Sequence, residues 1–191
     1  MSVYRLVQWV GKYVYVPLFN PKIIGKENIP ETGPVIIASN HIAGKDALNI
    51  LRATKREVHF LAKKELFENK LYSWIFKGVK CIPVDRSRKN PEAMKAAIDF
   101  LKQGGVIGIF PEGTRNRSTK LLPFKFGAVS LAQKTGATIV PLGISGKYSF
   151  RSKNLTARFG KPFKVKKSDD LEGVNQKLKN EVEKLIKEST K

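Results

Sequence analysis

A histidine and an aspartate that lie five residues apart form the first candidate for chemistry in this chain. His41 and Asp46 follow the apolar run Val35–Ser39, with Asn40 before them and Gly44 between them. In a continuous helix this spacing would turn the two side chains about 140° apart. We therefore expect His41 in a turn after a strand and Asp46 in the first turn of the next helix. A neutral imidazole oriented by a carboxylate is a general base that deprotonates hydroxyls at neutral pH. The alternative is a structural histidine beside an acidic helix N-terminus.

A second candidate is the segment Phe-Pro-Glu-Gly-Thr-Arg at residues 110–115, which follows the apolar run Val106–Ile109. A buried strand that ends in this way brings a carboxylate and a guanidinium to one edge of a sheet, where open α/β sheets bind ligands. The planar fork of Arg115 suits a phosphate, and Gly113 allows backbone N–H groups to approach it. The alternative is a tight surface turn with an ion pair between Glu112 and Arg115.

Two further segments complete a pattern of four. Residues 79–84 form a short apolar run that ends in Asp85 and Arg86, and residues 138–143 form an apolar strand that contains Pro141. In order and spacing, the four segments resemble the four sequence blocks of the glycerolipid acyltransferase family, over about residues 22–145. These blocks are N-H-x4-D, an apolar run ending in D-R, F-P-E-G-T-R and V-P-[VIL]. Many members carry Ser two residues after the histidine, where this chain has Ala43.

The resemblance implies an architecture and a mechanism. It implies a single α/β domain with a mixed, mostly parallel sheet flanked by helices, which the alternation of expected strands and helices also favours. It implies direct acyl transfer to a hydroxyl without a covalent intermediate, with His41 as the catalytic base and Asp46 as its catalytic partner. Arg86, Glu112 and Arg115 would hold the phosphate of the acceptor.

The resemblance also implies substrates. Acyl-CoA or acyl-carrier protein would be the co-substrate, with no metal or bound cofactor. The chain is most like the bacterial members, and lysophosphatidate is the expected acceptor because the chain is short and lacks the large extra domain usual in many enzymes that acylate glycerol 3-phosphate. Glycerol 3-phosphate, other lysophospholipids and an acylated amino lipid stay open as acceptors. Gly113 and Thr114 count as substrate-binding with the rest of their block, and so does Lys63. The oxyanion donor stays open between backbone N–H groups near Gly44 or Gly113 and the Lys63 side chain.

Composition narrows the classes of protein. The 191 residues carry a net charge of +20, which calls for a polyanionic partner such as nucleic acid, an anionic membrane surface or anionic substrates. Zinc-finger spacing and an aromatic-basic stacking block are missing from the sequence, so we expect no nucleic-acid partner. The G-x-S-x-G, Walker A, G-x-G-x-x-G and H-E-x-x-H motifs are also missing, so hydrolase, nucleotide-binding and zinc-protease chemistry lack support.

Three other residues have structural interpretations. The single cysteine, Cys81, excludes an internal disulfide, fits a reducing compartment and is expected to be buried among apolar neighbours. His59 is expected to be structural because the sequence shows no carboxylate spaced to orient it. Asn90 is expected to cap a helix that begins at Pro91.

The N-terminal segment suggests a membrane surface. Residues 1–20 are rich in aromatic and aliphatic side chains, with Arg5, Gln8 and Lys12 on one face of the expected helix. Such a helix is too polar to span a bilayer and is typical of an interfacial anchor. We therefore divide the chain into an interface helix at 1–20 and an acyltransferase domain at 21–191, bound peripherally at the cytoplasmic face. A second aromatic segment, residues 66–76, extends this surface or lines the acyl-chain entrance. The alternative is that both segments pack in the core or a dimer interface.

Overall fold

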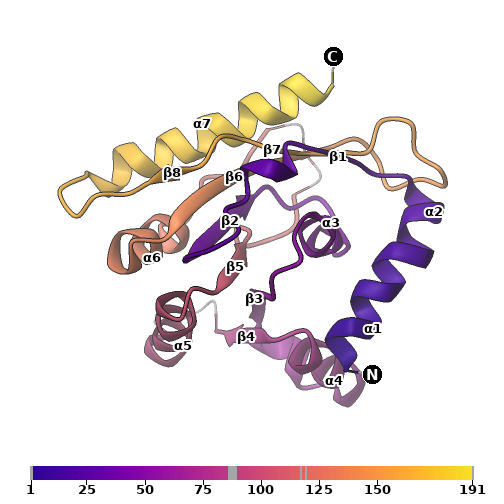
Figure 1. Ribbon diagram of the computed structural model, residues 1–191, viewed down its shortest axis with the longest axis horizontal. Helices are drawn as coiled ribbons and strands as arrows, with labels where there is room; N and C mark the ends of the chain where they lie inside the picture. Colours follow the sequence, from indigo (N-terminus) through magenta and orange to yellow (C-terminus); the bar gives the residue numbers. More distant parts are fainter. Residues whose placement is uncertain (1, 86–89, 117, 119, 191) are drawn as a thin grey trace.

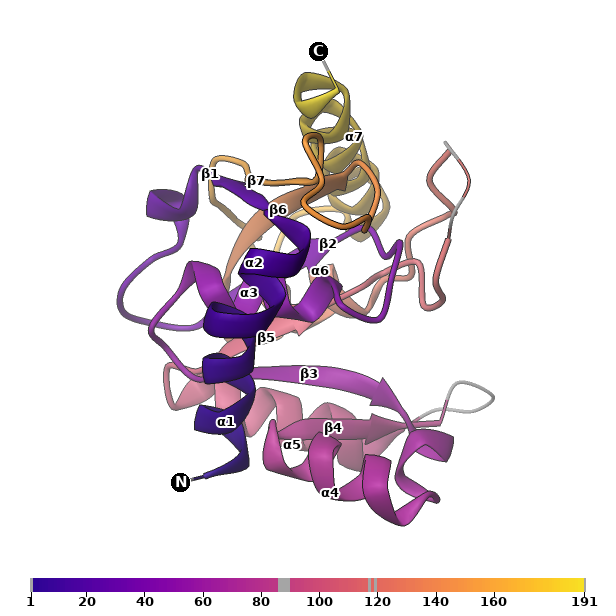
Figure 2. The same cartoon turned by 90° about the vertical axis from the view of Figure 1, so that its right-hand side faces the viewer.

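The computed structural model describes residues 2–85, 90–116, 118 and 120–190. In these residues eight strands form one mixed sheet with the order β1-β7-β6-β2-β5-β3-β4, and β8 pairs with β6. Five neighbouring pairs are parallel, while β7 and β8 run antiparallel to β6. Figure 2 shows β3 and β4 side by side in the same direction. The strands are β1 (Lys22–Ile24), β2 (Val35–Ser39), β3 (Val58–Lys63), β4 (Cys81–Val84), β5 (Val106–Ile109), β6 (Thr138–Ser145), β7 (Thr156–Phe159) and β8 (Phe163–Lys164).

Helices cover both faces of this sheet (Figure 1). The α-helices are α1 (Val3–Val10), α2 (Val16–Phe19), α3 (Asp46–Ala53), α4 (Lys70–Gly78), α5 (Pro91–Lys102), α6 (Gly127–Thr135) and α7 (Leu171–Ser189). A π-helical segment (Gly11–Tyr15) joins α1 to α2, and two 3-10 turns lie at Lys26–Asn28 and Lys64–Phe67. On α7, Glu183 and Lys187 form an ion pair at 2.9 Å.

The central strand β2 shows why its sequence is apolar throughout. Ile36 and Ala38 belong to the hydrophobic cluster beneath α5, α6 and α7, whereas Val35 and Ile37 belong to the cluster beneath α3 and the N-terminal helix. All four side chains are fully buried. A strand covered on both faces is apolar on both faces, which is the pattern of a parallel α/β sheet. The predicted fold class is therefore confirmed.

The N-terminal helix packs against the body of the protein along one side. Tyr15 is only 2% exposed, and the Tyr4 hydroxyl accepts a hydrogen bond from the backbone N–H of Val58 at 2.8 Å. The opposite side carries Trp9 and Tyr13, which are half-exposed and whose rings lie 5.3 Å apart. The expected surface helix is thus present, but part of its apolar face belongs to the core. The domain boundary at residue 20 stays a prediction.

Asparagine side chains decide the local structure in two places. Asn90 occupies the expected N-cap position of α5, but its side chain makes no capping bond there and instead bonds the backbone N–H and carbonyl of Asp85. The aromatic segment at residues 66–76 is not one continuous helix, because Asn69 accepts hydrogen bonds from the backbone N–H groups of Leu71 and Tyr72 and so caps a separate α4.

Candidate active site

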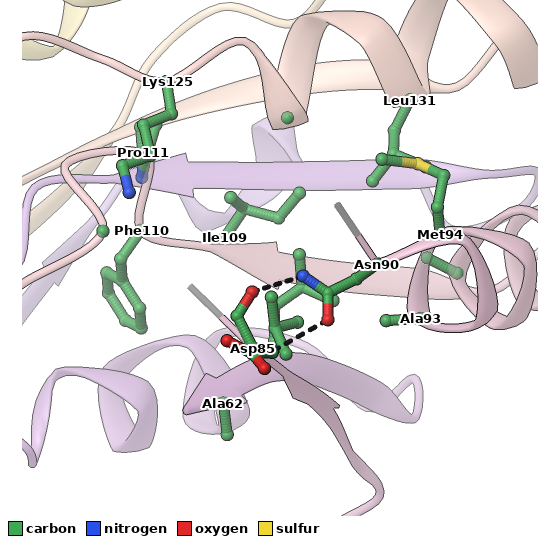
Figure 3. A pocket seen from close by; sticks show the side chains of 15 residues that line it. Ala62, Asp85, Asn90, Ala93, Met94, Ile109, Phe110, Pro111, Lys125 and Leu131 are labelled. Carbon is green, nitrogen blue, oxygen red and sulfur yellow. Dashed lines mark hydrogen bonds between the residues drawn. The ribbon is translucent and has the colours of Figure 1, made fainter. Parts of the chain in front are cut away.

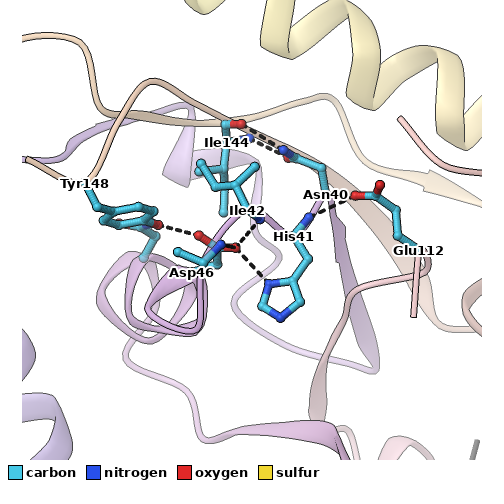
Figure 4. Close-up of polar contacts among 9 residues, drawn as sticks. Asn40, His41, Ile42, Asp46, Glu112, Ile144 and Tyr148 are labelled. Carbon is cyan, nitrogen blue, oxygen red and sulfur yellow. Dashed lines mark hydrogen bonds and ion pairs between the residues drawn. The ribbon is translucent and has the colours of Figure 1, made fainter. Parts of the chain in front are cut away.

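The candidate site lies where parallel strands end. Strands β2, β3, β5 and β6 run in one direction, so the turns that follow them gather at a single edge of the sheet. The turn after β2 carries His41, the turn after β5 carries Glu112, and the loop after β6 carries Tyr148 (Figure 4). Residues that are far apart in sequence thereby meet at this edge.

His41 and Asp46 are in direct contact, as their spacing predicts. His41 Nδ1 lies 2.8 Å from Asp46 Oδ2, and the imidazole stacks on Phe110 with ring centroids 4.1 Å apart. The His41 side chain is 17% exposed and the Asp46 side chain is fully buried. Because Nδ1 is bound to the carboxylate, Nε2 is the ring nitrogen available to a substrate, and it points away from Asp46 in Figure 4.

The position of Asp46 follows from its place as the first residue of α3. Its Oδ2 also accepts the backbone N–H groups of Ile42 and Ala43, at 2.7 and 2.8 Å, as expected of an acidic group at a helix N-terminus. Its Oδ1 accepts the hydroxyl of Tyr148 at 2.5 Å. The carboxylate is therefore oriented before any substrate arrives.

Glu112 joins the two sequence motifs. One carboxylate oxygen accepts the backbone N–H of His41 at 3.0 Å, and the other accepts the Asn116 amide and the backbone N–H of Leu122. Glu112 is 5% exposed. The resemblance implied that it holds the acceptor phosphate, and the turn alternative paired it with Arg115. The structure instead gives both oxygens to protein donors, so we revise its role to a brace beneath His41.

Asn40 is a second brace that sequence reasoning did not assign. Its side chain donates to the carbonyl of Ile144 at 2.9 Å and accepts the Ile144 N–H at 2.8 Å, which ties the His41 turn to β6. A backbone bond from Asn116 to the carbonyl of His41, 2.6 Å long, adds a tie to the turn after β5. The signal in the sequence was the place of Asn40 directly after a buried strand, because a buried amide needs hydrogen-bond partners.

The remaining predicted substrate ligands occupy different environments. Thr114 and Arg115 are exposed, and Gly113 has a φ of +71°, which favours glycine. The Gly113 N–H bonds the carbonyl of Phe110, which weakens its candidacy as an oxyanion donor. Lys63 lies at the same edge, at the end of β3, and pairs with Glu65 at 3.1 Å. Arg86 lies outside the described residues.

An apolar pocket of about 290 Å³ adjoins the site (Figure 3). Phe110, which stacks on His41, lines one end together with Lys125, and Met94 and Leu131 line the other. Lys125 reaches over Gly113, where an added Cβ would lie 3.1 Å from its ammonium nitrogen. No sequence motif points to Lys125, which lies twelve residues after Gly113.

Cys81 and His59 lie away from this chemistry. Burial raises the pKa of the Cys81 thiol to about 12, so the thiol stays protonated at neutral pH. Contrary to expectation, His59 has a carboxylate neighbour. Oε1 of Glu57, the residue just before β3, lies 2.8 Å from His59 Nε2. The imidazole also stacks on Phe100 at 3.5 Å. His59 lies near the start of β3, whereas the candidate site lies at the carboxyl ends of the strands, and this position supports the structural interpretation.

A histidine–carboxylate pair at the carboxyl edge of an α/β sheet, beside an apolar pocket, is the arrangement of an enzyme. The Acyltransferase family model matches residues 20–145, and the chain belongs to this family. It is 36% identical to the 1-acyl-sn-glycerol-3-phosphate acyltransferase of Bacillus subtilis over 74% of this chain and 72% of that protein. The Borreliella burgdorferi protein of the same description is 36% identical over 72% of this chain and 56% of its own length.

A solved structure supports the same conclusion. The crystal structure of the 1-acyl-sn-glycerophosphate (LPA) acyltransferase PlsC from Thermotoga maritima matches with a TM-score of 0.80 and 26% identity. The match covers 98% of this chain and 79% of that chain. The predicted family and enzyme class are therefore confirmed.

Proposed function

We propose that this enzyme transfers an acyl group from acyl-CoA or acyl-carrier protein to the free hydroxyl of lysophosphatidate, which yields phosphatidate. The observation that carries the proposal is the contact between His41 and the buried Asp46 at the strand ends. The acceptor is taken from the relatives, whose descriptions name 1-acyl-sn-glycerol-3-phosphate as their substrate.

The mechanism uses the two nitrogens of His41 differently. Nδ1 is held by Asp46, and Nε2 takes the proton from the acceptor hydroxyl. The hydroxyl oxygen then bonds to the thioester carbonyl carbon, and the tetrahedral oxyanion collapses with cleavage of the carbon–sulfur bond. The proton on Nε2 passes to the departing thiolate, so the products are an ester and a free thiol. Asp46 keeps the ring in one tautomer and stabilises the imidazolium. The chemistry needs no metal or bound cofactor, which stays a prediction.

The apolar pocket is our candidate for the acyl chain. It begins at Phe110, next to the imidazole, and its lining toward Met94, Ala97 and Leu131 is largely hydrocarbon. Burying methylene groups there stabilises the complex by about 0.8 kcal/mol each. Lys125 at the near end supplies a positive charge beside the reacting carbonyl or the phosphate.

A thiol-release assay tests the proposed function. Purified protein receives acyl-CoA or acyl-carrier protein with lysophosphatidate, glycerol 3-phosphate or lysophosphatidylcholine as acceptor. We expect release with lysophosphatidate to exceed the other two clearly. Equal or greater release with another acceptor would contradict the assigned substrate, and no release with any of the three would contradict acyl transfer to these lipids.

Arg115→Ala is expected to weaken use of phosphate-bearing acceptors. Loss of a charge-assisted contact costs about 1.5–3 kcal/mol in kcat/KM, and Arg115 is exposed at the site edge where it can meet a phosphate. Kinetics with lysophosphatidate, together with Tm, provide the measurement. Arg158→Ala is the matched control, because that guanidinium bonds Ser189 on α7. Unchanged acceptor kinetics with a lowered Tm would make Arg115 structural.

We also propose that the enzyme binds a membrane surface through α1, α2 and α4. Within the described residues, no helix combines the length and hydropathy needed to cross a bilayer. Two groups of aromatic and aliphatic side chains are nevertheless at least 40% exposed: Trp9, Tyr13, Val14 and Leu18, and Leu71, Tyr72 and Trp74. Their helices are neighbours, since an added Cβ at Gly78 of α4 would collide with Val3 of α1. Exposed Trp and Tyr near basic residues favour an anionic lipid surface.

Charged substitutions in this surface are expected to release the protein from anionic vesicles. Trp9→Glu and Leu71→Glu should each weaken cosedimentation by about tenfold, because each removes apolar contact and adds repulsion. Deleting residues 1–20 would be a poor test, since it would also remove buried Tyr15. Ile24→Glu, an exposed position on β1, is the control. Wild-type binding of both variants would rule out this surface.

A further inference from the structure

A chain of side-chain hydrogen bonds runs from the carboxylate of Asp46 to the N-terminal helix. The Tyr148 hydroxyl donates to Asp46 Oδ1 at 2.5 Å, on the side of the carboxylate opposite His41 (Figure 4). The Asn49 amide donates to the Tyr148 oxygen at 3.0 Å, and the Tyr15 hydroxyl donates to Asn49 Oδ1 at 2.8 Å. Asn49 and Asp46 are fully buried, and Tyr15 is 2% exposed.

The direction of every bond in this chain is the same. Because Asn49 donates its N–H to the Tyr148 oxygen, the Tyr148 proton is directed to Asp46. Burial raises the pKa of Tyr148 well above its ordinary value, and the neighbouring charge of Asp46 raises it further. The phenol therefore stays protonated and acts as a donor. Hydrogen bonds aligned in this way polarise and strengthen one another.

The fold brings these groups together from three separate segments. Tyr148 lies in the loop after β6, Asn49 and Asp46 lie on α3, and Tyr15 ends the π-helical segment. A π-helical turn widens the helix and is frequent at functional positions. The rings of Tyr15 and Phe19 lie 6.3 and 5.9 Å from that of Tyr148, so the phenol packs against the N-terminal helix.

The hydrogen bond from Tyr148 helps to fix the orientation of the Asp46 carboxylate. Asp46 Oδ2 accepts hydrogen bonds from His41 Nδ1 and from two backbone N–H groups, whereas Oδ1 accepts its hydrogen bond from Tyr148. Without that donor a buried anionic oxygen loses a strong partner, and its charge is redistributed toward the imidazole. A change at Tyr148 is therefore expected to act on His41 through Asp46.

We propose that Tyr148 is a positioning residue for the Asp46–His41 pair, held in place through Asn49 by Tyr15 of the N-terminal helix. The inference rests on the proposed function, in which His41 is the base. It extends the candidate site to a residue that lies 102 positions from Asp46 in the sequence.

Kinetics of Tyr148→Phe form the first test. We expect kcat to fall about tenfold through loss of one charge-assisted bond, while KM for both substrates stays within about twofold. The acid limb of the pH–rate profile should move to higher pH, because a carboxylate with one donor fewer holds the proton on the imidazole more strongly. Of the neighbouring ionisable groups, Glu112 accepts the His41 backbone N–H, Lys45 lies over the Tyr148 ring, Tyr15 lies near Asp46 and Arg52 lies near Tyr15. All four are unchanged in this variant.

Nuclear magnetic resonance gives a readout that needs no substrate. The chain contains two histidines, so a His59→Gln variant assigns the ring signals of His41. We expect Tyr148→Phe to move the Nδ1–H signal of His41 downfield. Tyr15→Phe should move this signal by a smaller amount in the same direction. The double variant should show no larger shift, and no lower kcat, than Tyr148→Phe alone, because Tyr15 acts through Tyr148.

Tyr4→Phe is the matched control. It removes a partly buried hydroxyl from the same helix and the same hydrophobic cluster, but that hydroxyl bonds Val58. It should leave kcat and the His41 signal unchanged even where Tm falls. The inference is overturned if folded Tyr148→Phe keeps the wild-type kcat, pH profile and His41 signal, or if folded Tyr15→Phe does so when Tyr148→Phe does not fold. Inactive wild-type protein would contradict the proposed function, and the His41 signal would still decide the inference.

Discussion

His41→Ala is expected to lower kcat by about 10²–10⁴-fold, since the acceptor hydroxyl would lose its general base. The fold should persist: the side chain is 17% exposed, and the turn is held by backbone bonds to Glu112 and Asn116 that alanine retains. The measurement is thiol release at saturating substrates, with circular dichroism and Tm on the same preparation. His59→Ala is the control, because that imidazole stacks on Phe100 away from the site. Near-normal turnover in folded His41→Ala protein would eliminate the proposed mechanism.

Asp46→Asn should lower kcat by nearly as much as His41→Ala, for a different reason. The amide keeps one oxygen but offers an N–H₂ group to a site where the structure supplies only donors, from His41, two backbone N–H groups and Tyr148. The imidazole would then lose its orientation or adopt the wrong tautomer. A fall in Tm is expected as well, so the informative comparison is kcat at a temperature where both variants are folded.

Glu112→Gln is expected to lower both stability and turnover if Glu112 is a brace. Its two oxygens accept the N–H groups of His41, Asn116 and Leu122, so an amide nitrogen at either position would face a donor. One buried mismatch of this kind costs about 1–3 kcal/mol in the free energy of unfolding. Turnover should fall by about 10–100-fold, because a catalytic turn displaced by an ångström loses its alignment with the substrate.

The two roles of Glu112 give opposite patterns in this experiment. A brace predicts a lower Tm and a lower kcat with little change in the KM for lysophosphatidate. A substrate ligand, as the family resemblance implied, predicts an unchanged Tm and a raised KM. Glu65→Gln is the control, since Glu65 is an exposed carboxylate at the same sheet edge that pairs with Lys63. The second pattern would overturn the revised role.

The sequence by itself determined the elements and the chemical groups. Runs such as Val35–Ser39 and Val106–Ile109 are apolar on both faces, and this property follows from local composition whatever the order of the strands. The His41–Asp46 contact could also be predicted, because five residues of turn and helix start fix where the two side chains point. The catalytic role of the pair stays a prediction, as do the substrate contacts at Arg86 and Arg115.

Only the tertiary structure decided what each group contacts across the sheet. The bonds of Glu112 to His41, Tyr148 to Asp46 and Asn40 to Ile144 span 71, 102 and 104 residues. Such contacts depend on β2 lying between β5 and β6, an order that no local pattern specifies. The same holds for the N-terminal helix, whose sequence suits both lipid and a protein core. In the folded protein Tyr15 is buried and Trp9 is half-exposed, because a helix that packs against a protein buries only the face that it turns toward it.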